Sequence, residues 1–172
     1  NEGIDFISAD GQLIGFTSSR DGGMGSSDIH FSTLDGNQWS NQVNIGNVVN
    51  GSDWDSNSTL SYDGNKMVFA SSRDGGYGGS DLYMTEKNIY GDWGPAMNLG
   101  PIVNTPFGET APFLSQDGRT LYFASEGHPG FGSYDVFKTV WEDGKWSIPV
   151  NLGQPLNTPE RDDYFTIGGS GE

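Results

Sequence analysis

The sequence predicts an all-β protein assembled from repeated antiparallel units rather than from helices. A glycine-rich stretch occurs three times in the 172 residues, ends each time in an aspartate and opens a short apolar run. Four markers in and around this stretch recur at intervals of 53 or 54 residues. They are the Asp-Gly pairs at Asp10, Asp63 and Asp117, the loop aspartates Asp28, Asp81 and Asp135, the tryptophans Trp39, Trp93 and Trp146, and the asparagines Asn44, Asn98 and Asn151.

A period of this length is typical of propellers, solenoids and other repeat arrays. In the third copy, turn signals and β-forming residues predict four short strands, at 111–114, 120–124, 134–140 and 146–150. No segment has a helical apolar period long enough to compete. Four-stranded antiparallel units of this kind are β-propeller blades.

One domain, residues 1–172, is expected to contain blades at about 3–50, 54–104 and 108–157. Residues 162–168 repeat the pattern of a first strand and predict the start of a fourth blade. Three blades do not close a ring, which usually needs about four to eight. We therefore expect a segment of a longer propeller, a homo-oligomer that closes the ring, or an open arc with covered edges.

Charge restricts the classes of partner. Eight Lys and Arg against 23 Asp and Glu give a net charge of −15, which repels nucleic acid and anionic membranes. Cations, cationic partners and neutral glycans remain. The chain has no cysteine, so disulfides, thiolate metal sites and cysteine nucleophiles are excluded. It also lacks an apolar stretch of about 18 residues, so no membrane span is expected.

The blade pattern combines Ser-x-Asp-Gly, Leu-Tyr-Phe-Ala-Ser, Gly-Gly-x-Gly and Asp-Leu-Tyr. Residues 121–125 and 151–158, Asn-Leu-Gly-Gln-Pro-Leu-Asn-Thr, match it especially well. Over about residues 5–165 the chain resembles the WD40-like β-propeller repeats of TolB-type and OmpA-associated periplasmic proteins. This resemblance implies an exported bacterial protein, periplasmic or extracellular, whose propeller is an interaction platform that usually lacks catalysis.

The loop aspartates Asp28, Asp81 and Asp135 have two readings. A carboxylate just before a strand can accept hydrogen bonds from the N–H groups of the loop, which makes these residues structural ties. Alternatively, Asp21 with Asp28, or Asp74 with Asp81, contributes oxygens to a calcium site alongside loop carbonyls. The third loop has no clear match to Asp74, so one site per blade is not expected.

A second cation candidate lies between the first two blades, where Asp53, Asp55 and Asn57 alternate as at the start of an EF-hand loop. The motif is incomplete, because Ser58 and Asn65 stand where its glycine and distal glutamate belong. The alternative is a polar connection between blades.

The three repeated tryptophans are predicted to pack between blades. Trp54 and Trp141 fall outside the repeat register, and His128 lies in the divergent third loop. These three residues are therefore candidates for contact with a partner.

No catalytic motif accompanies either histidine, and the sequence has no nucleophile elbow, His-Glu-x-x-His or phosphate loop. The leading hypothesis is a non-catalytic, exported propeller module that binds a protein or a cell-envelope component. One alternative is a calcium- or glycan-binding module. The other is a hydrolase or lyase with an acidic central funnel, in which a pair of carboxylates acts on a glycoside.

Overall fold

The computed structural model describes residues 2–167, which form fourteen strands and no helix. Each repeat forms one sheet. The first sheet contains β1 (Glu2–Ile7), β2 (Leu13–Ser18), β3 (Asp28–Asp35), β4 (Gln38–Trp39) and β5 (Val43–Asn44). The second contains β6 (Asp55–Leu60), β7 (Lys66–Ser71), β8 (Asp81–Glu86) and β9 (Met97–Asn98). The third contains β10 (Glu109–Leu114), β11 (Thr120–Ser125), β12 (Asp135–Glu142), β13 (Lys145–Trp146) and β14 (Val150–Asn151).

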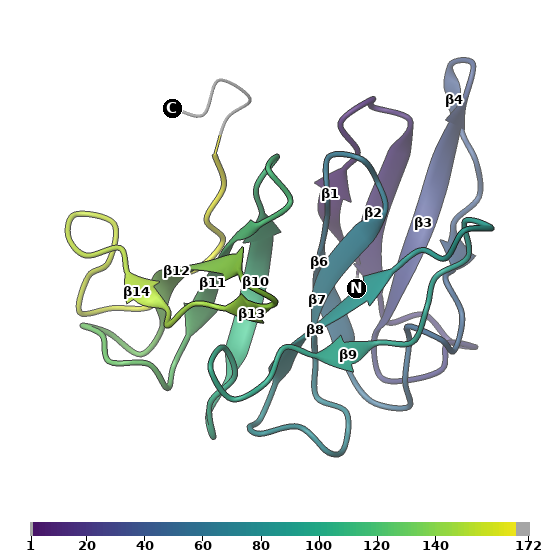
Figure 1. The fold of residues 1–172 in the computed structure, drawn as a ribbon. Coiled ribbons are helices and arrows are strands. Elements are labelled where there is room, and N and C mark those ends of the chain that lie inside the picture. Colours follow the sequence, from purple (N-terminus) through teal and green to yellow (C-terminus); the bar gives the residue numbers. More distant parts are fainter. Residues whose placement is uncertain (1, 168–172) are drawn as a thin grey trace.

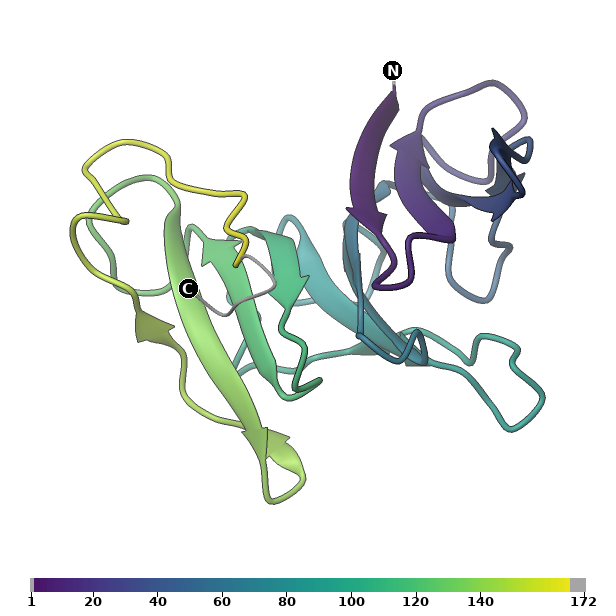
Figure 2. The same cartoon turned by 90° about the horizontal axis from the view of Figure 1, so that it is seen from above.

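All strand pairs within the sheets are antiparallel, and the strands follow one another in chain order. In the first and third sheets the last two strands, β4 and β5 or β13 and β14, both pair with the third strand. The three sheets stand next to one another in an arc, which Figures 1 and 2 show from two directions. The prediction of an all-β chain built from antiparallel blades is confirmed.

The fourth strand of the third blade differs from the predicted range 146–150. Residues 147–149 leave the strand, and only the short pieces β13 and β14 pair with β12. Pro149 has no N–H to give to a ladder. The side chain of Ser147 takes part instead, because its Oγ accepts a hydrogen bond from the Val140 N–H at 3.0 Å.

The hydrophobic core lies between sheets rather than within one. Alternate residues of a strand face opposite sides, so Leu121 and Phe123 face the second sheet while Tyr122 faces away from it. The cluster between the first and second sheets consists of Ile29, Val49, Met67, Phe69 and Tyr83. The cluster between the second and third consists of Val68, Ala70, Leu82, Val103, Leu114, Leu121, Phe123, Phe137 and Trp146.

The outer faces of the end blades lack the cover that a neighbouring blade provides. Leu156 is 51% exposed, whereas Val49 and Val103 at the same repeat position are fully buried. Trp39 on the first sheet is 43% exposed, against 5% for Trp146. A longer propeller, a homo-oligomer or an open arc with covered edges would each account for these faces, and all three stay predictions.

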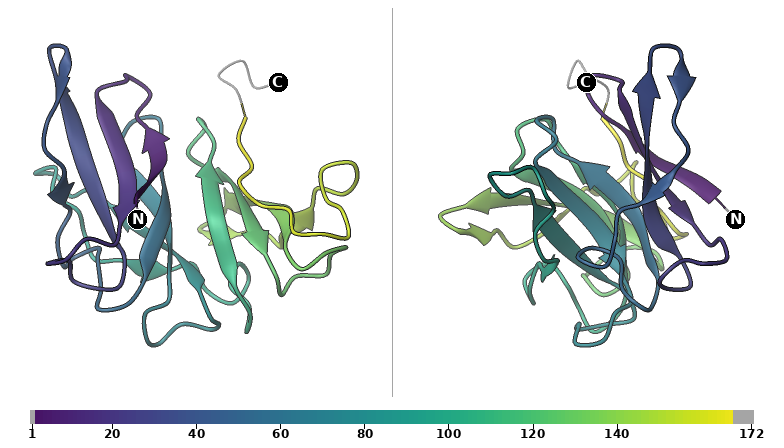
Figure 3. Two further views of the ribbon diagram at one scale, coloured as in Figure 1. Left: turned by 180° about the vertical axis from the view of Figure 1, so that it is seen from behind. Right: turned by 90° about the vertical axis from the view of Figure 1, so that its right-hand side faces the viewer.

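Residues 162–167 were expected to form the first strand of a fourth blade, and they form no strand. Residue 168, the last of that predicted strand, lies outside the described residues. The segment does begin as a first strand should: the Asp162 N–H donates to the Tyr134 carbonyl at 2.9 Å, as the Glu109 N–H does to the Ser80 carbonyl. Strands need a paired neighbour, and no second strand of a fourth blade lies within residues 2–167. Figure 3 shows this segment, in yellow, beside the third sheet.

A bulge interrupts every first strand. The pairing register shifts between Ile4 and Phe6, between Ser56 and Thr59, and between Thr110 and Phe113. In the second and third blades the bulge contains a residue other than glycine with positive φ: 51° at Asn57 and 47° at Ala111. Bulges of this kind re-aim side chains. The first strands of neighbouring blades contact one another, so their bulges lie along one shared surface.

Each glycine-rich loop presses against the connection that leads into the next blade. A Cβ on Gly25 would overlap the carbonyl oxygen of Asp53, and a Cβ on Gly78 would overlap that of Phe107. The neighbouring Gly79 N–H donates to the same Phe107 carbonyl at 2.8 Å. Glycine is therefore required here for close approach of two backbones.

We expect Gly78→Ala to lower the free energy of unfolding by more than about 1 kcal/mol, because one of the two backbones must move away. Gly79→Ala is the matched control, since no atom lies within 4 Å of the added methyl group. Urea denaturation of both variants measures the difference. Equal stability of the two variants would contradict the close-approach argument.

Candidate functional site

The loop aspartates are buried, with 1 to 2% of their surface exposed. Asp28 accepts hydrogen bonds from the backbone N–H groups of Met24 at 2.6 Å and Gly25 at 3.2 Å. Its carboxylate also accepts one from Asn44 Nδ2 at 3.2 Å. Asp81 repeats this pattern with Tyr77 N, Gly78 N and Asn98 Nδ2. Both carboxylates thus hold their loops against the start of the third strand.

The third loop is built differently. Gly75 has φ 87°, and Pro129 stands at the same repeat position. Proline cannot adopt positive φ, so the backbone of the third loop takes another course. Phe131 N and Gly132 N both donate to Oδ2 of Asp135, and Asn151 Nδ2 donates to the Pro129 carbonyl instead of to the carboxylate. Oδ1 of Asp135 is buried without a hydrogen-bond partner.

A second repeated contact, between an asparagine side chain and the backbone of the third strand, was not predicted from the sequence. Asn50 is buried; its Oδ1 accepts from the Ile29 N–H, and its Nδ2 donates to the Ile29 carbonyl, both at 2.9 Å. Asn104 and Asn157 make the same pair of bonds to Leu82 and Val136. The 53- to 54-residue spacing of these asparagines was the signal that could have identified them.

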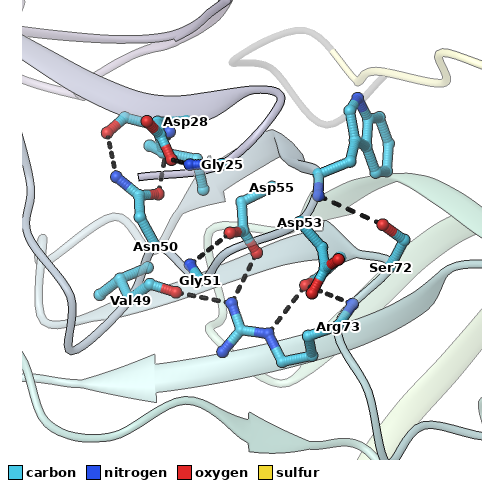
Figure 4. A network of polar contacts seen from close by, with 12 residues as sticks. Gly25, Asp28, Val49, Asn50, Gly51, Asp53, Asp55, Ser72 and Arg73 are labelled. Atoms are coloured by element: carbon cyan, nitrogen blue, oxygen red, sulfur yellow. Dashed lines mark hydrogen bonds and ion pairs between the residues drawn. The ribbon is translucent and has the colours of Figure 1, made fainter. Parts of the chain in front are cut away.

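Asp55 forms an ion pair within the second blade, and its arginine partner also bonds to the first blade (Figure 4). Its carboxylate is fully buried and lies 2.6 Å from Nη2 of Arg73. The same nitrogen donates to the carbonyl of Val49 in the first blade, and the Gly51 N–H donates to Asp55 at 2.6 Å. The guanidinium also lies over the rings of Phe69 and Tyr83, 5.2 and 4.8 Å from their centres. We call this cluster of Asp55, Arg73, Val49 and Gly51 the blade clasp.

In the third blade the ring of His128 fills the space that the guanidinium of Arg73 fills in the second, although Gly127 holds the repeat position of Arg73. Its Nε2 lies 2.9 Å from the Val103 carbonyl, the repeat equivalent of Val49. Its ring packs on Phe123 and Phe137, at the positions of Phe69 and Tyr83. The buried acid here is Glu109, which accepts bonds from Thr105 N, Thr105 Oγ1 and Ser125 Oγ. His128 is therefore partly buried between two blades.

The other predicted site residues are dispersed. Trp54 packs partly buried against the cluster between the second and third sheets, and Trp141 lies edge-on to Trp146 with 5.2 Å between ring centres. Asp21 and Asp74 are exposed in their loops. The Asp53 carbonyl accepts from the Ser26 N–H, whereas Asp55 and Asn57 turn to other partners. Across residues 2–167 no three histidine or acidic side chains form a group that could hold a metal ion.

Three adjoining hollows lie along the first strands. Two adjoining cavities, of about 340 and 400 Å³, share Ile7, Leu60, Phe113 and Leu114 as lining residues. A third, of about 400 Å³, shares Ile4, Asp5, Asn57 and Tyr164 with the first. We call the three together the first-strand groove. Asn57 is the one residue among the predicted candidates that lines it.

Three carboxylates line the first-strand groove. Asp117, in an Asp-Gly turn, accepts four hydrogen bonds, and these hold its pKa well below the usual range although partial burial acts in the opposite direction. Glu2 pairs with Arg20. Asp5 accepts bonds from Ser58 and Thr17, yet burial raises its pKa above the ordinary value. Asp5 is therefore the acid that is neither tied into a turn nor ion-paired.

No family model and no curated protein matches the sequence. Solved structures do. TolB from Acinetobacter baumannii matches 99% of this chain with a TM-score of 0.65 at 14% identity. An α-L-arabinofuranosidase from Lactobacillus brevis matches 98% with a TM-score of 0.61 at 16% identity. A puromycin-hydrolysing peptidase from Mycobacterium tuberculosis matches 96% with a TM-score of 0.58 at 14% identity.

The fold is that of a partial, TolB-like β-propeller. The chain spans 36%, 61% and 26% of the TolB, arabinofuranosidase and peptidase chains. At these identities the likeness concerns the fold alone, and the matched proteins differ in what they do. What this chain does must therefore be inferred from the residues of the first-strand groove.

We expect Arg73→Leu to lower the free energy of unfolding by about 3–5 kcal/mol, because it leaves the buried carboxylate of Asp55 without a counter-charge. Arg20→Leu is the matched control. Arg20 occupies the same repeat position but pairs with Glu2 at the surface, so its loss should cost about 1 kcal/mol or less. Urea denaturation measures both, and similar losses would show that the blade clasp is not the stabilising contact.

Glu109 should make stability depend on pH. Burial raises its pKa above 4.5 in the native state, so the native carboxyl binds a proton more tightly than the unfolded one. The contribution of Glu109 to the free energy of unfolding is fully present below pH 4.5 and is lost as the pH rises through the native pKa. Urea denaturation of the parent and Glu109→Gln from pH 4 to 8 should show the parent losing stability relative to the variant across this window. A difference independent of pH would contradict the argument; Glu126→Gln is the control.

Proposed function

We propose that this chain is a non-catalytic binding module of an exported protein, and that it holds a protein or cell-envelope partner in the first-strand groove. The observation that carries the proposal is that all three blades contribute their first strands to one continuous hollow. A surface shared by several repeats is the usual binding surface of a repeat protein.

The lining of the groove supports binding of a partly apolar partner. Ile7 is 60% exposed and Tyr62 63% exposed, and both border the hollow beside Leu60 and Phe113. Such side chains cost little to cover, because burying apolar surface on association is favourable. The polar bulge residues Asn57 and Ser58 add hydrogen-bonding groups along the same wall. Apolar pockets with a few polar groups are typical ligand sites.

The carboxylates of the groove support binding over hydrolysis. Glycoside hydrolysis needs a protonated acid and a second, free carboxylate. Asp117 is engaged by its turn, and the same Ser-x-Asp-Gly arrangement recurs at Asp10 and Asp63, where it serves the turn of each blade. A repeated structural carboxylate does not provide the free partner that Asp5 would need, and Glu2 is paired with Arg20.

Export rests on the resemblance of the blade pattern to periplasmic propeller repeats. Residues 2–167 contain no helix long and apolar enough to cross a membrane. The charge of −15 adds support for a partner that is neutral or cationic, because it disfavours nucleic acid and anionic surfaces.

The test compares two exposed isoleucines. A partner captured from bacterial envelope extract is purified, and its affinity for the parent, Ile7→Glu and Ile89→Glu is measured by calorimetry. Ile7 borders the groove, whereas Ile89 is 92% exposed and lies between β8 and β9, outside the groove. We expect a loss of about tenfold or more for Ile7→Glu and little change for Ile89→Glu.

The reverse ranking, or the absence of any retained partner, would overturn the groove as the binding site. Turnover of a glycoside or peptide that disappears with Asp5→Asn would overturn the non-catalytic assignment.

A further inference from the structure

The first-strand groove changes character along its length. One end is bordered by Leu60, Tyr62, Phe113 and Tyr122. The other end is polar and is bordered by Ser56, Thr17 and Ser27. Asp5 lines both the central and the polar cavity, so it stands where the apolar part ends. A ligand that fills the groove therefore meets large apolar and aromatic side chains on one side of Asp5, beside the polar residues of the turns.

Asp5 is not part of the repeated framework. The equivalent positions in the following units are Ser58, Pro112 and Phe165, none of which carries a charge. The loop aspartates, the turn aspartates and the buried acids Asp55 and Glu109 all recur at repeat positions, and their roles are explained by the fold. Asp5 is a single carboxylate added to the strand that lines the groove.

The hydrogen bonds of Asp5 fall mainly on one oxygen. Oδ2 accepts from Ser58 N at 3.0 Å, Ser58 Oγ at 2.8 Å and Thr17 Oγ1 at 3.0 Å. Oδ1 lies 3.2 Å from the same Thr17 hydroxyl, which has one hydrogen to share. Oδ1 therefore retains the capacity to accept a further, stronger bond.

Within the described part of the chain, no cation compensates this charge. None of the ion pairs found in residues 2–167 includes Asp5. The three cavities of the groove are lined by neither lysine nor arginine. A desolvated carboxylate without a counter-charge is costly, and the raised pKa of Asp5 reflects that cost. A positive group delivered by a ligand removes it.

We propose that the groove takes an extended peptide segment whose apolar side chains cover Leu60 and Phe113 and whose lysine side chain pairs with Oδ1 of Asp5. This proposal rests on the proposed function, since it names the partner chemistry for the same groove. The stem of a lysine is apolar and its ammonium group is a compact charge, which suits a carboxylate at the border of an apolar hollow.

The test uses two matched panels of acetylated, amidated pentapeptides. The flanking positions vary among Phe, Leu, Ile and Val, and the central residue is lysine in one panel and norleucine in the other, which removes the ammonium group alone. Affinities for the parent, Asp5→Asn, Asp74→Asn and Ile7→Glu are measured by fluorescence anisotropy. Asp74 is exposed in a loop outside the groove and controls for the loss of one negative charge.

We expect the parent to bind the best lysine peptides at least about threefold more tightly than their norleucine partners. Asp5→Asn should abolish that preference and keep the norleucine affinity, while Asp74→Asn retains the preference. Added salt should reduce it. Ile7→Glu should weaken both panels.

Equal binding of the two panels to the parent, or a preference that survives Asp5→Asn, overturns the pairing with lysine and leaves the groove as a binding site. Binding that Ile7→Glu does not weaken, or no binding by either panel, overturns the peptide proposal for this groove. Failure of the charge arm is thus distinguishable from failure of the groove itself.

Discussion

The hydrogen bonds between a buried aspartate and its glycine-rich loop are the constraint on which the arc of blades depends. Asp81 is 1% exposed, and its carboxylate holds the Tyr77 and Gly78 N–H groups at 2.5 and 3.1 Å. The loop is then fixed where Gly78 meets the Phe107 carbonyl and the Ser80 carbonyl accepts the N–H of Glu109. That contact starts the first strand of the following blade, and first strands form the groove. A carboxylate buried for structural reasons therefore determines where the first-strand groove lies.

Some of this organisation is readable from the sequence because the repeat enforces it. A residue that recurs every 53 or 54 positions, such as Asp28 and its equivalents, serves the blade, and its surroundings can be inferred from neighbouring glycines and strands. Tertiary partners escape such reasoning. Asp55 resembled a calcium ligand because its neighbours alternate with it, yet its partner is Arg73, eighteen residues away. The bulge at Asn57, with φ 51°, redirects the side chains that alternation would have put on one face.

The groove itself was not predicted, since it depends on how three first strands come together. Asp5 matches no motif, so no sequence pattern marks it as a site residue. Its departure from the repeat is nevertheless visible by alignment with Ser58, Pro112 and Phe165. In a repeat protein, residues that obey the period mostly explain the fold, and residues that break it are the better candidates for function. His128 shows the limit of that rule, because it breaks the pattern and yet replaces Arg73 in a packing role.

The second and third blades contact the preceding blade through different residues, and this difference has a consequence for folding. Near-identical repeats can pair with the wrong copy, and repeat proteins characteristically fail by such misassembly. Arg73 pairs with Asp55 of its own blade and donates to the Val49 carbonyl of the preceding one. In the third blade Gly127 holds the repeat position of Arg73, and a Cβ added there would overlap Thr105, the repeat equivalent of Gly51. If the second blade took the place of the third, Arg73 would keep its ion pair with Asp55, but its side chain would begin where an added Cβ overlaps Thr105. The difference between the two blades thus disfavours their exchange, so that the order of blades in the arc follows their order in the chain.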